Sequence, residues 1–209
     1  MIPQNVNYRE FIGTFVAVIL AITVHEFAHA KMADSSGDST PRMAGRVSLN
    51  PLDHFDVFGM MMIIWMCLGG FGIGWGKPVP VNPLNFDHPR RDDIKVSLAG
   101  IVTNLLLATV VAIPLRFNLV PSTGSLDYHW LLEQIVLVNV FIAFFNLIPV
   151  PPLDGSHVLA NLLPVNIARA YGRIFGRYGF LILIMLLFTG VIYQIVVPPA
   201  DLTLRLLLG

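Results

Sequence analysis

The sequence contains few charged residues and a single cysteine. Asp, Glu, Lys and Arg make up 12% of its 209 residues, about half the share found in a typical soluble domain. Apolar residues account for 55% of the chain, and the mean hydropathy is +0.71. Because Cys67 is alone, no disulfide can form within the chain. This composition favours an integral membrane protein over a soluble domain.

The sequence also lacks an excess of charge of either sign. Its 13 basic and 13 acidic residues give a formal net charge of zero at pH 7. Nucleic-acid binding usually needs a strongly basic surface, so we expect no nucleic-acid partner. The partner that the composition predicts is the lipid bilayer. An oligomer is compatible with the sequence, but no feature of it indicates one.

Five apolar runs approach or reach the ~20 residues that a helix needs to cross a bilayer. They cover residues 11–31, 57–75, 94–114, 130–146 and 179–197. The first run lacks the basic flank and small-residue cleavage site of a signal peptide, so we expect it to be retained. The second ends in GGFGIGWG, whose glycines allow the chain to turn back. The predicted fold class is an all-α polytopic membrane protein with about four full transmembrane helices.

Two segments are expected to include extended backbone. Residues 57–93 are predicted to form a re-entrant helix followed by an extended loop that contains KPVPVNP. In the polar stretch 34–56, Gly45 is followed by alternating polar and apolar residues, Arg46 to Leu49. That alternation predicts a small β-hairpin.

The stretch TVHEFAHAKM, residues 23–32, places ionisable side chains at the end of the first apolar run. Residues four apart share one face of a helix, so His25 and His29 can bind one metal ion together. Glu26 stands beside them, where a carboxylate can deprotonate a zinc-bound water. Two ordinary core histidines are the alternative, but ionisable groups inside a membrane are costly and usually functional. The pattern therefore predicts a zinc site.

A catalytic zinc site needs a third protein ligand and leaves a fourth position for water. Asp154, in FFNLIPVPPLDGSH, lies 125 positions after His29. Three prolines precede it, at 149, 151 and 152, and proline cannot continue a regular helix, so we expect the chain to unwind before Asp154. On local grounds alone, Asp154 is equally well explained as a metal ligand or as part of an Asp-Gly turn.

Taken together, HEFAH on a membrane helix and NLIPVPPLDG after a later one resemble the site-2 protease family of intramembrane zinc metalloproteases. The resemblance implies that His25, His29 and Asp154 bind one zinc ion per chain. The family motif N-x-x-P-x-x-x-L-D-G places its Asn and Pro on Asn146 and Pro149.

Two further stretches resemble the compact prokaryotic branch of this family. Residues 74–83, GWGKPVPVNP, are close to its G-W-x-K-P-V-P-V-N-P loop. Residues 97–108, SLAGIVTNLLLA, are similar to its A-G-P-x-x-N helix, although Ile101 stands where proline is usual. The match covers about residues 10–160 and leaves no room for a PDZ or CBS-type domain. We therefore expect a single membrane-embedded metalloprotease domain, 1–209, with its catalytic core at about 10–160 and a C-terminal helix at about 179–197.

The resemblance implies hydrolysis of a peptide bond within or near the transmembrane segment of single-span membrane proteins. Zinc would activate a water, with Glu26 as general base. Asn146 is expected to stabilise the oxyanion, and a helix C-cap is an equally good explanation of this residue. The extended KPVPVN stretch is expected to bind the unwound substrate by strand pairing, through Val79, Val81 and Asn82.

Sidedness follows from the requirement that Asp154 reach the depth of His25. If the first run ends in the cytoplasm, the fourth must end there too, and residues 57–93 must start and finish on one side. Basic residues agree with this arrangement, because three lie outside and ten inside. The ten are Lys31, Arg42, Arg46, Lys77, Arg90, Arg91, Lys95, Arg169, Arg173 and Arg177. We expect a multi-pass protein of a prokaryotic cell membrane, with its active site near the cytoplasmic side.

Two other classes of function remain as alternatives. A metal-ion transporter or channel would also place polar groups inside the membrane. It would have no need for Glu26 between the ligands, and the sequence has no duplicated halves. A catalytically inactive membrane scaffold would bind partners without cutting them, and the intact His-Glu-His trio argues against it.

Overall fold

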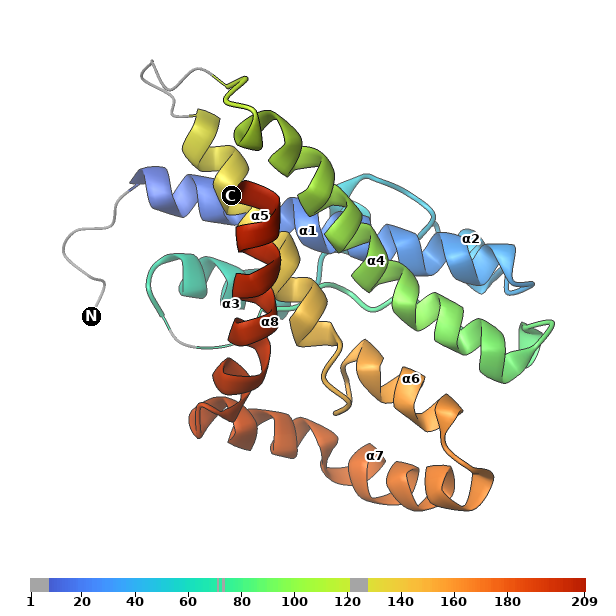
Figure 1. Cartoon of the computed structure of the whole chain (residues 1–209). Coiled ribbons are helices and arrows are strands. Elements are labelled where there is room, and N and C mark those ends of the chain that lie inside the picture. Colours follow the sequence, from blue (N-terminus) through green and yellow to red (C-terminus); the bar gives the residue numbers. More distant parts are fainter. Residues whose placement is uncertain (1–7, 71, 73, 121–127) are drawn as a thin grey trace.

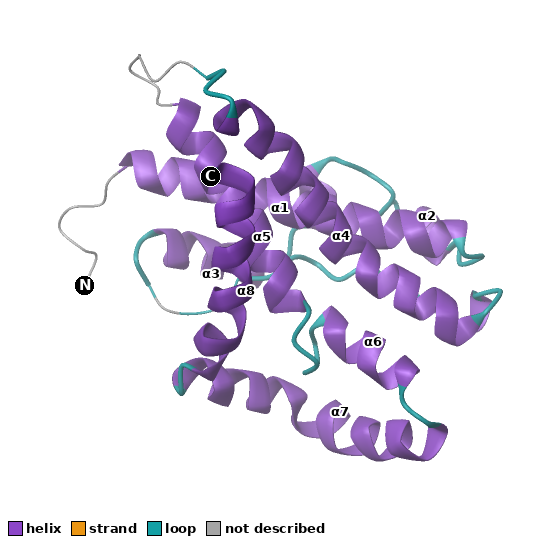
Figure 2. Cartoon of the chain, in the orientation of Figure 1, coloured by secondary structure: helices purple, strands orange, loops and turns teal. Residues whose placement is uncertain are grey.

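The computed structural model describes residues 8–70, 72, 74–120 and 128–209, and its regular elements in these ranges are all helical (Figures 1 and 2). They are α1 (Tyr8–Ser35), α2 (Thr40–Met43), the 3₁₀ helix η1 (Pro51–His54), α3 (Val57–Cys67), the 3₁₀ helix η2 (Pro83–Asn85), α4 (Pro89–Arg116), α5 (Tyr128–Asn146), α6 (Asp154–Leu162), α7 (Val165–Phe188) and α8 (Val191–Leu208). Five helices, α1, α4, α5, α7 and α8, are long and apolar enough to cross a membrane. The predicted all-α polytopic class is confirmed, with five candidate spans rather than about four.

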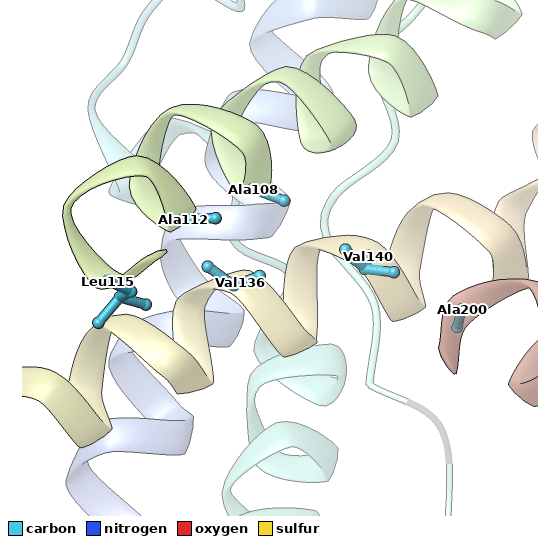
Figure 3. Close-up of a cluster of buried hydrophobic side chains, with 6 residues drawn as sticks. All are labelled: Ala108, Ala112, Leu115, Val136, Val140 and Ala200. Atoms are coloured by element: carbon cyan, nitrogen blue, oxygen red, sulfur yellow. The ribbon is translucent and has the colours of Figure 1, made fainter. Parts of the chain in front are cut away.

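Helices α1, α4 and α5 pack closely because small residues line their contacts. Six buried side chains from α4, α5 and α8 form one cluster, shown in Figure 3: Ala108, Ala112, Leu115, Val136, Val140 and Ala200. A second cluster joins α1 to α5 through Ala17, Ala21, Ile135 and Val138. In lipid, small residues let helix backbones approach closely enough for van der Waals contact to hold them together.

One end of the molecule gathers segments that are far apart in the sequence. The C-terminal end of α1, all of α2 and the N-terminal ends of α4 and α7 lie toward the right of Figure 1. The N-terminal end of α1 and the C-terminal end of α4 lie toward the opposite end (Figure 1). Helices α1, α4 and α7 therefore share an end that carries α2 and residues 85–93. The loop after α2 runs back along α1, where Leu49 and Pro51 line a hollow with Phe15 and Val16.

The predicted β-hairpin is wrong, since no strand forms among the described residues. The segment after α2 is a loop whose Arg46 side chain donates hydrogen bonds to the carbonyls of Lys77 and Pro78. The nearest extended segment is KPVPV, in which two of the five residues are prolines without an N–H. A β-ladder needs backbone N–H donors on both strands, and these prolines have none. Among the described residues, an isolated antiparallel bridge joins Phe55 and Gly76.

Helix α3 has 11 residues, or ~16 Å at ~1.5 Å per residue, which is about half the hydrocarbon thickness of a bilayer. The chain then returns to the point where α3 begins. The Asp56 carboxylate accepts hydrogen bonds from the Gly59 N–H at 2.9 Å and from Nε1 of Trp75 at 3.1 Å. Next to it, the Lys77 N–H donates to His54 O at 2.8 Å. Of the predicted glycine-rich turn, residues 71 and 73 lie outside the described residues.

The predicted C-terminal helix at 179–197 is also wrong, because two helices meet within it. Helix α7 ends at Phe188, and Gly190 adopts φ 74°, a left-handed conformation that glycine tolerates and that terminates helices. The Thr189 hydroxyl donates to Met185 O at 2.9 Å and helps to close the last turn of α7. Only Thr189 and Gly190 separate the apolar residues on the two sides of this turn, so hydropathy alone does not reveal the break.

Candidate metal centre

Three predicted metal ligands from distant parts of the sequence converge on one point. Nε2 of His25 and Nε2 of His29, both on α1, lie 2.9 Å apart. Oδ2 of Asp154, the first residue of α6, lies 3.1 Å from the first nitrogen and 3.3 Å from the second. Both histidines are buried, and the predicted convergence of two imidazoles and one carboxylate is therefore present in the structure.

The hydrogen bonds of the two imidazoles show that this cluster fits a cation. His29 Nδ1 lies 2.7 Å from Val96 O, a group that can only accept, so Nδ1 carries the proton and Nε2 has the lone pair. The same tautomer holds for His25, whose Nδ1 faces Asn104 Oδ1 at 2.6 Å. Two lone pairs and a buried carboxylate oxygen without a hydrogen-bond partner therefore face one another. Such a set suits a tetrahedral zinc ion with one open position.

Asn104 on α4 links three helices through its amide. Its Oδ1 accepts from His25, and its Nδ2 donates to Ala21 O at 3.1 Å and to Asn139 Oδ1 at 2.7 Å. The Asn139 amide in turn donates to Ile135 O at 2.8 Å. Both asparagines are fully buried, and the amide orientation follows because Nδ2 of Asn104 faces only acceptors. Because both acceptors hold Nδ2, the Asn104 amide cannot rotate. Its Oδ1 therefore fixes the orientation of the His25 ring.

Gly100, one turn before Asn104, leaves the space that the imidazoles occupy. A Cβ at this position would lie 2.6 Å from Cε1 of His25 and 2.7 Å from Nε2 of His29. Distances below 3.0 Å are not found for real Cβ atoms. The absence of a side chain on this face of α4 is therefore what allows both rings to sit between α1 and α4.

Comparison with known proteins agrees with this geometry. The family model described as "Peptidase family M50" matches residues 125–189. YwhC of Bacillus subtilis is 36% identical over 83% of this chain and 79% of its own length. MJ0611 of Methanocaldococcus jannaschii is 43% identical over 74% and 73%, and Rip2 of Mycolicibacterium smegmatis is 30% identical over 89% and 72%. The chain belongs to peptidase family M50. This confirms the resemblance to site-2 proteases.

All three of these M50 relatives carry the name "Putative zinc metalloprotease". No solved structure matches the chain significantly. Zinc is the metal of family M50, and the two imidazoles and one carboxylate of this chain fit that ion.

The segment that presents Asp154 folds tightly on itself. Helix α5 ends at Asn146, and the chain unwinds over residues 147–153, as the prolines predict. A Cβ on Gly155 would lie 2.2 Å from Leu147 O, so only glycine lets the start of α6 rest on this backbone. Helix α7 supports the same segment, since Tyr171 OH donates to Pro149 O at 2.9 Å.

Glu26 is half-buried beside the returning loop that follows α3. A Cβ on Gly76 would lie 3.5 Å from Cγ of Glu26 and 2.7 Å from Cγ2 of Ile22. The extended loop therefore reaches the depth of Glu26, next to the metal ligands. The start of this loop therefore lies close to the predicted general base.

Four further residues were predicted to bind substrate or the oxyanion, and they do not form one cluster. Val79 is half-buried in the extended loop, whereas Val81 packs against the cluster formed by Ala33, Phe86 and Val96. The Asn82 side chain accepts from the Leu84 N–H at 3.2 Å and caps η2. At the end of α5, Asn146 donates to Ile142 O at 3.0 Å, within its own helix.

Two residues of the site were not predicted from the sequence. Asn104 is one of them, because the sequence does not show that its side chain lies opposite His25. Gly100 is the other, and in the sequence it is one glycine within the stretch 97–108. Their spacing of one helical turn was the available signal, and it becomes meaningful once α4 is known to face His25 and His29.

Proposed function

We propose that this M50 protein is an intramembrane zinc endopeptidase that cuts single-span membrane proteins within or near their transmembrane segment. The observation that carries the proposal is the convergence of His25, His29 and Asp154, with Glu26 beside them, inside a bundle of membrane-length helices. Ionisable groups are placed at that depth when function requires them. A metal-bound water at that depth would supply the nucleophile that hydrolysis of a peptide bond inside lipid requires.

Zinc bound by His25, His29 and Asp154 would supply a water of lowered pKa, about 7, and Lewis acidity at the scissile carbonyl. Glu26 takes the proton of the attacking water and passes it to the leaving nitrogen. Asn104 and the Val96 carbonyl hold the imidazole protons on Nδ1, so both Nε2 lone pairs point into the site.

Asn146 remains the proposed donor to the oxyanion. An amide can stabilise negative charge without adding a charge of its own. Its Nδ2 carries two hydrogens, and the bond to Ile142 O uses one of them. The second is the hydrogen that the proposal assigns to the substrate. In the alternative, Asn146 serves only to end α5.

The extended loop is proposed to bind the substrate as a strand. The His54 carbonyl and the Arg46 side chain occupy the backbone groups of Lys77. In contrast, the N–H and C=O of Val79 have no hydrogen-bond partner among the described residues. Pro78 and Pro80 keep the segment extended on either side of it. Val79 is therefore the central candidate for pairing, and Val81 and Asn82 flank it.

We further propose a multi-pass protein of the prokaryotic cell membrane, with its site near the cytoplasmic face. Support comes from the shared end of α1, α4 and α7 (Figure 1), which holds most of the basic residues. A helical substrate must unwind to expose its carbonyls. Substrates with glycine or proline near the cytoplasmic end of their span should be favoured, because these residues weaken helices by ~1 and ~3 kcal/mol relative to alanine.

Cleavage of tagged single-span substrates by purified protein in detergent tests the proposal. Wild type should cut and should carry about one zinc per chain, while Glu26→Gln should retain zinc and lose cleavage. His25→Ala and Asp154→Ala should lose zinc strongly. Val79→Gly should lower cleavage with zinc content unchanged. A Glu26→Gln protein that cuts at the wild-type rate would exclude Glu26 as the base, and zinc flux through vesicles without cleavage would favour a transporter.

A further inference from the structure

Helix α7 carries a row of polar residues that the proteolytic site does not use. Asn166, Arg169, Arg173 and Arg177 are spaced by three or four residues, so they share one face, and all are exposed. We call this row the arginine stripe. A shallow, open hollow on the surface of α7 is lined by Asn166, Arg169, Gly172 and Arg173. These residues belong to the first half of α7, whose N-terminal end lies toward the right of Figure 1.

The positive charge of the stripe is not neutralised within the described part of the chain. None of Arg169, Arg173 and Arg177 forms an ion pair there, and Arg177 only stacks on Tyr178, 5.5 Å from its ring centre. Two exposed arginines elsewhere in the chain do have acidic partners. Arg42 lies 2.5 Å from the Asp34 carboxylate and Arg205 lies 2.9 Å from the Asp201 carboxylate. The stripe therefore presents unpaired guanidinium groups to its surroundings.

The residues that follow the stripe indicate what those surroundings are. Phe180, Leu181, Met185 and Phe188 are between 60% and 74% exposed, and they continue along α7 after Arg177. So large an apolar surface on a helix of membrane length is expected to face lipid acyl chains. The arginines at the other end of the same helix would then lie at the level of the lipid headgroups.

We propose that the arginine stripe binds the headgroup of an anionic phospholipid. Guanidinium groups bind phosphate oxygens with two parallel hydrogen bonds, and Arg169 and Arg173 stand one turn apart on the rim of the hollow. The Asn166 amide adds a neutral donor. Gly172 and Gly176 have no atom within 4 Å of a built Cβ, so the surface beside the arginines is open. The acyl chains would run along Phe180 and Leu181.

The stripe is connected to the metal centre through the body of α7. Tyr171 lies between Arg169 and Arg173 in sequence, and its hydroxyl donates to Pro149 O. Farther along, a Cβ on Gly179 would lie 2.8 Å from Pro151 O, so α7 rests directly on the segment that presents Asp154.

Lipid binding to the full-length protein in detergent tests the proposal. Native mass spectrometry would measure retained dioleoyl phosphatidylglycerol and dioleoyl phosphatidylcholine at equal mole fraction, with thermal unfolding as a second readout. Wild type should prefer phosphatidylglycerol. The double variant Arg169→Gln/Arg173→Gln should bind it roughly 30-fold more weakly, the equivalent of about 2 kcal/mol for two arginines. Binding of phosphatidylcholine should not change.

Arg205→Gln is the matched control, since it removes an exposed arginine of α8 and should leave the lipid preference intact. Zinc content should be equal in all three proteins, which separates loss of the lipid site from misfolding. Equal retention of the two lipids by wild type, or an unchanged preference in the double variant, would overturn the proposal. So would full competition by inorganic phosphate, which would make a free anion the ligand, or tighter binding of a glutamate-rich peptide, which would make it an acidic protein segment.

Discussion

Asn104 Oδ1 accepts the Nδ1 proton of His25 at 2.6 Å, and this bond fixes which nitrogen of the ring faces the metal centre. Asn104→Leu keeps a similar volume and removes the acceptor. We expect zinc affinity to fall by roughly 10- to 100-fold, the usual effect of losing a partner that orients a metal ligand. Competition with a zinc-binding dye, measured on folded protein, gives the affinity.

Asn139→Leu provides a graded comparison, because it leaves Asn104 in place and removes one of the two acceptors that its Nδ2 bonds. Its loss of zinc affinity should be smaller. Asn161→Leu on α6 is the control, because it makes the same substitution at an amide that donates to Asp93 and not to the asparagine pair. It should retain the wild-type affinity for zinc. A tighter zinc complex in Asn139→Leu than in wild type would show that the asparagine pair does not serve the metal centre.

Gly100→Ala should remove zinc although alanine is the better helix former. The added Cβ would lie within 2.7 Å of atoms in both imidazoles, so the rings must move. We expect zinc content to fall well below one per chain and the unfolding temperature to drop. Gly176→Ala is the control, since a Cβ there meets no atom within 4 Å and should add up to ~1 kcal/mol of helix stability. Equal zinc content in the two variants would contradict the packing argument.

The metal ligands were predictable because metal chemistry restricts both residue type and spacing. Two histidines four apart can share a zinc ion wherever the helix lies, and Asp154 follows from the need for a third ligand. Asn104 could not be assigned in the same way. An asparagine in a membrane helix bonds whichever polar group lies opposite, and only the packing of α4 against α1 places His25 there.

Residues 34–56, 85–93 and 165–177 should all face the cytoplasm. Single cysteines replacing Ser35, His88 and Asn166 in a Cys67→Ser background should react with an impermeant maleimide only from that side. A cysteine replacing Asn118 should react only from the other. This follows from the shared end of α1, α4 and α7 (Figure 1) and from the side on which basic residues gather. Labelling of position 88 only from outside would exclude a re-entrant segment 57–93.

Asp38 should stabilise the contact between the start of α2 and residues 82–85 in a pH-dependent way. Burial tends to raise its pKa, but hydrogen bonds from Thr40, Asn82 and Asn85 outweigh this and hold the pKa of Asp38 below its ordinary value. A carboxylate whose pKa is lowered by folding contributes stability above its unfolded value, ~3.9, and loses it as the pH falls further. Asp38→Asn should therefore unfold at a lower temperature at pH 7.

The size of that effect should be about 1.5–3 kcal/mol, which is typical of hydrogen bonds to a charged group. Differential scanning fluorimetry of both proteins from pH 7 to pH 3 measures it. The gap between wild type and Asp38→Asn should narrow below about pH 4. A gap that stays constant over this range would show that the charge of Asp38 is not what stabilises the loop.

Two elements of the fold could not be read from the sequence for identifiable reasons. The alternation after Gly45 would form a hairpin only against a partner that can donate, and the loop opposite has prolines at 78 and 80. The apolar run at 179–197 gave no sign of ending, because a single Gly190 with positive φ costs nothing in hydropathy. In both cases a backbone property decided the outcome: the missing N–H groups of two prolines in the first, and the positive φ of one glycine in the second. Hydrophobic periodicity contains no information about either.

The metal centre also acts as a cross-link between two halves of the chain. His29 and Asp154 stand 125 positions apart, so an ion shared by them closes a loop that includes α2 to α5. Closing a loop of ~100 residues limits the freedom of an unfolded chain by an amount worth ~4.7 kcal/mol for a covalent bridge. Chelation would therefore do more than stop chemistry. It would remove the link between the start of α6 and α1. The packing of α6 against α4 and α7 would then be what holds α6 in place.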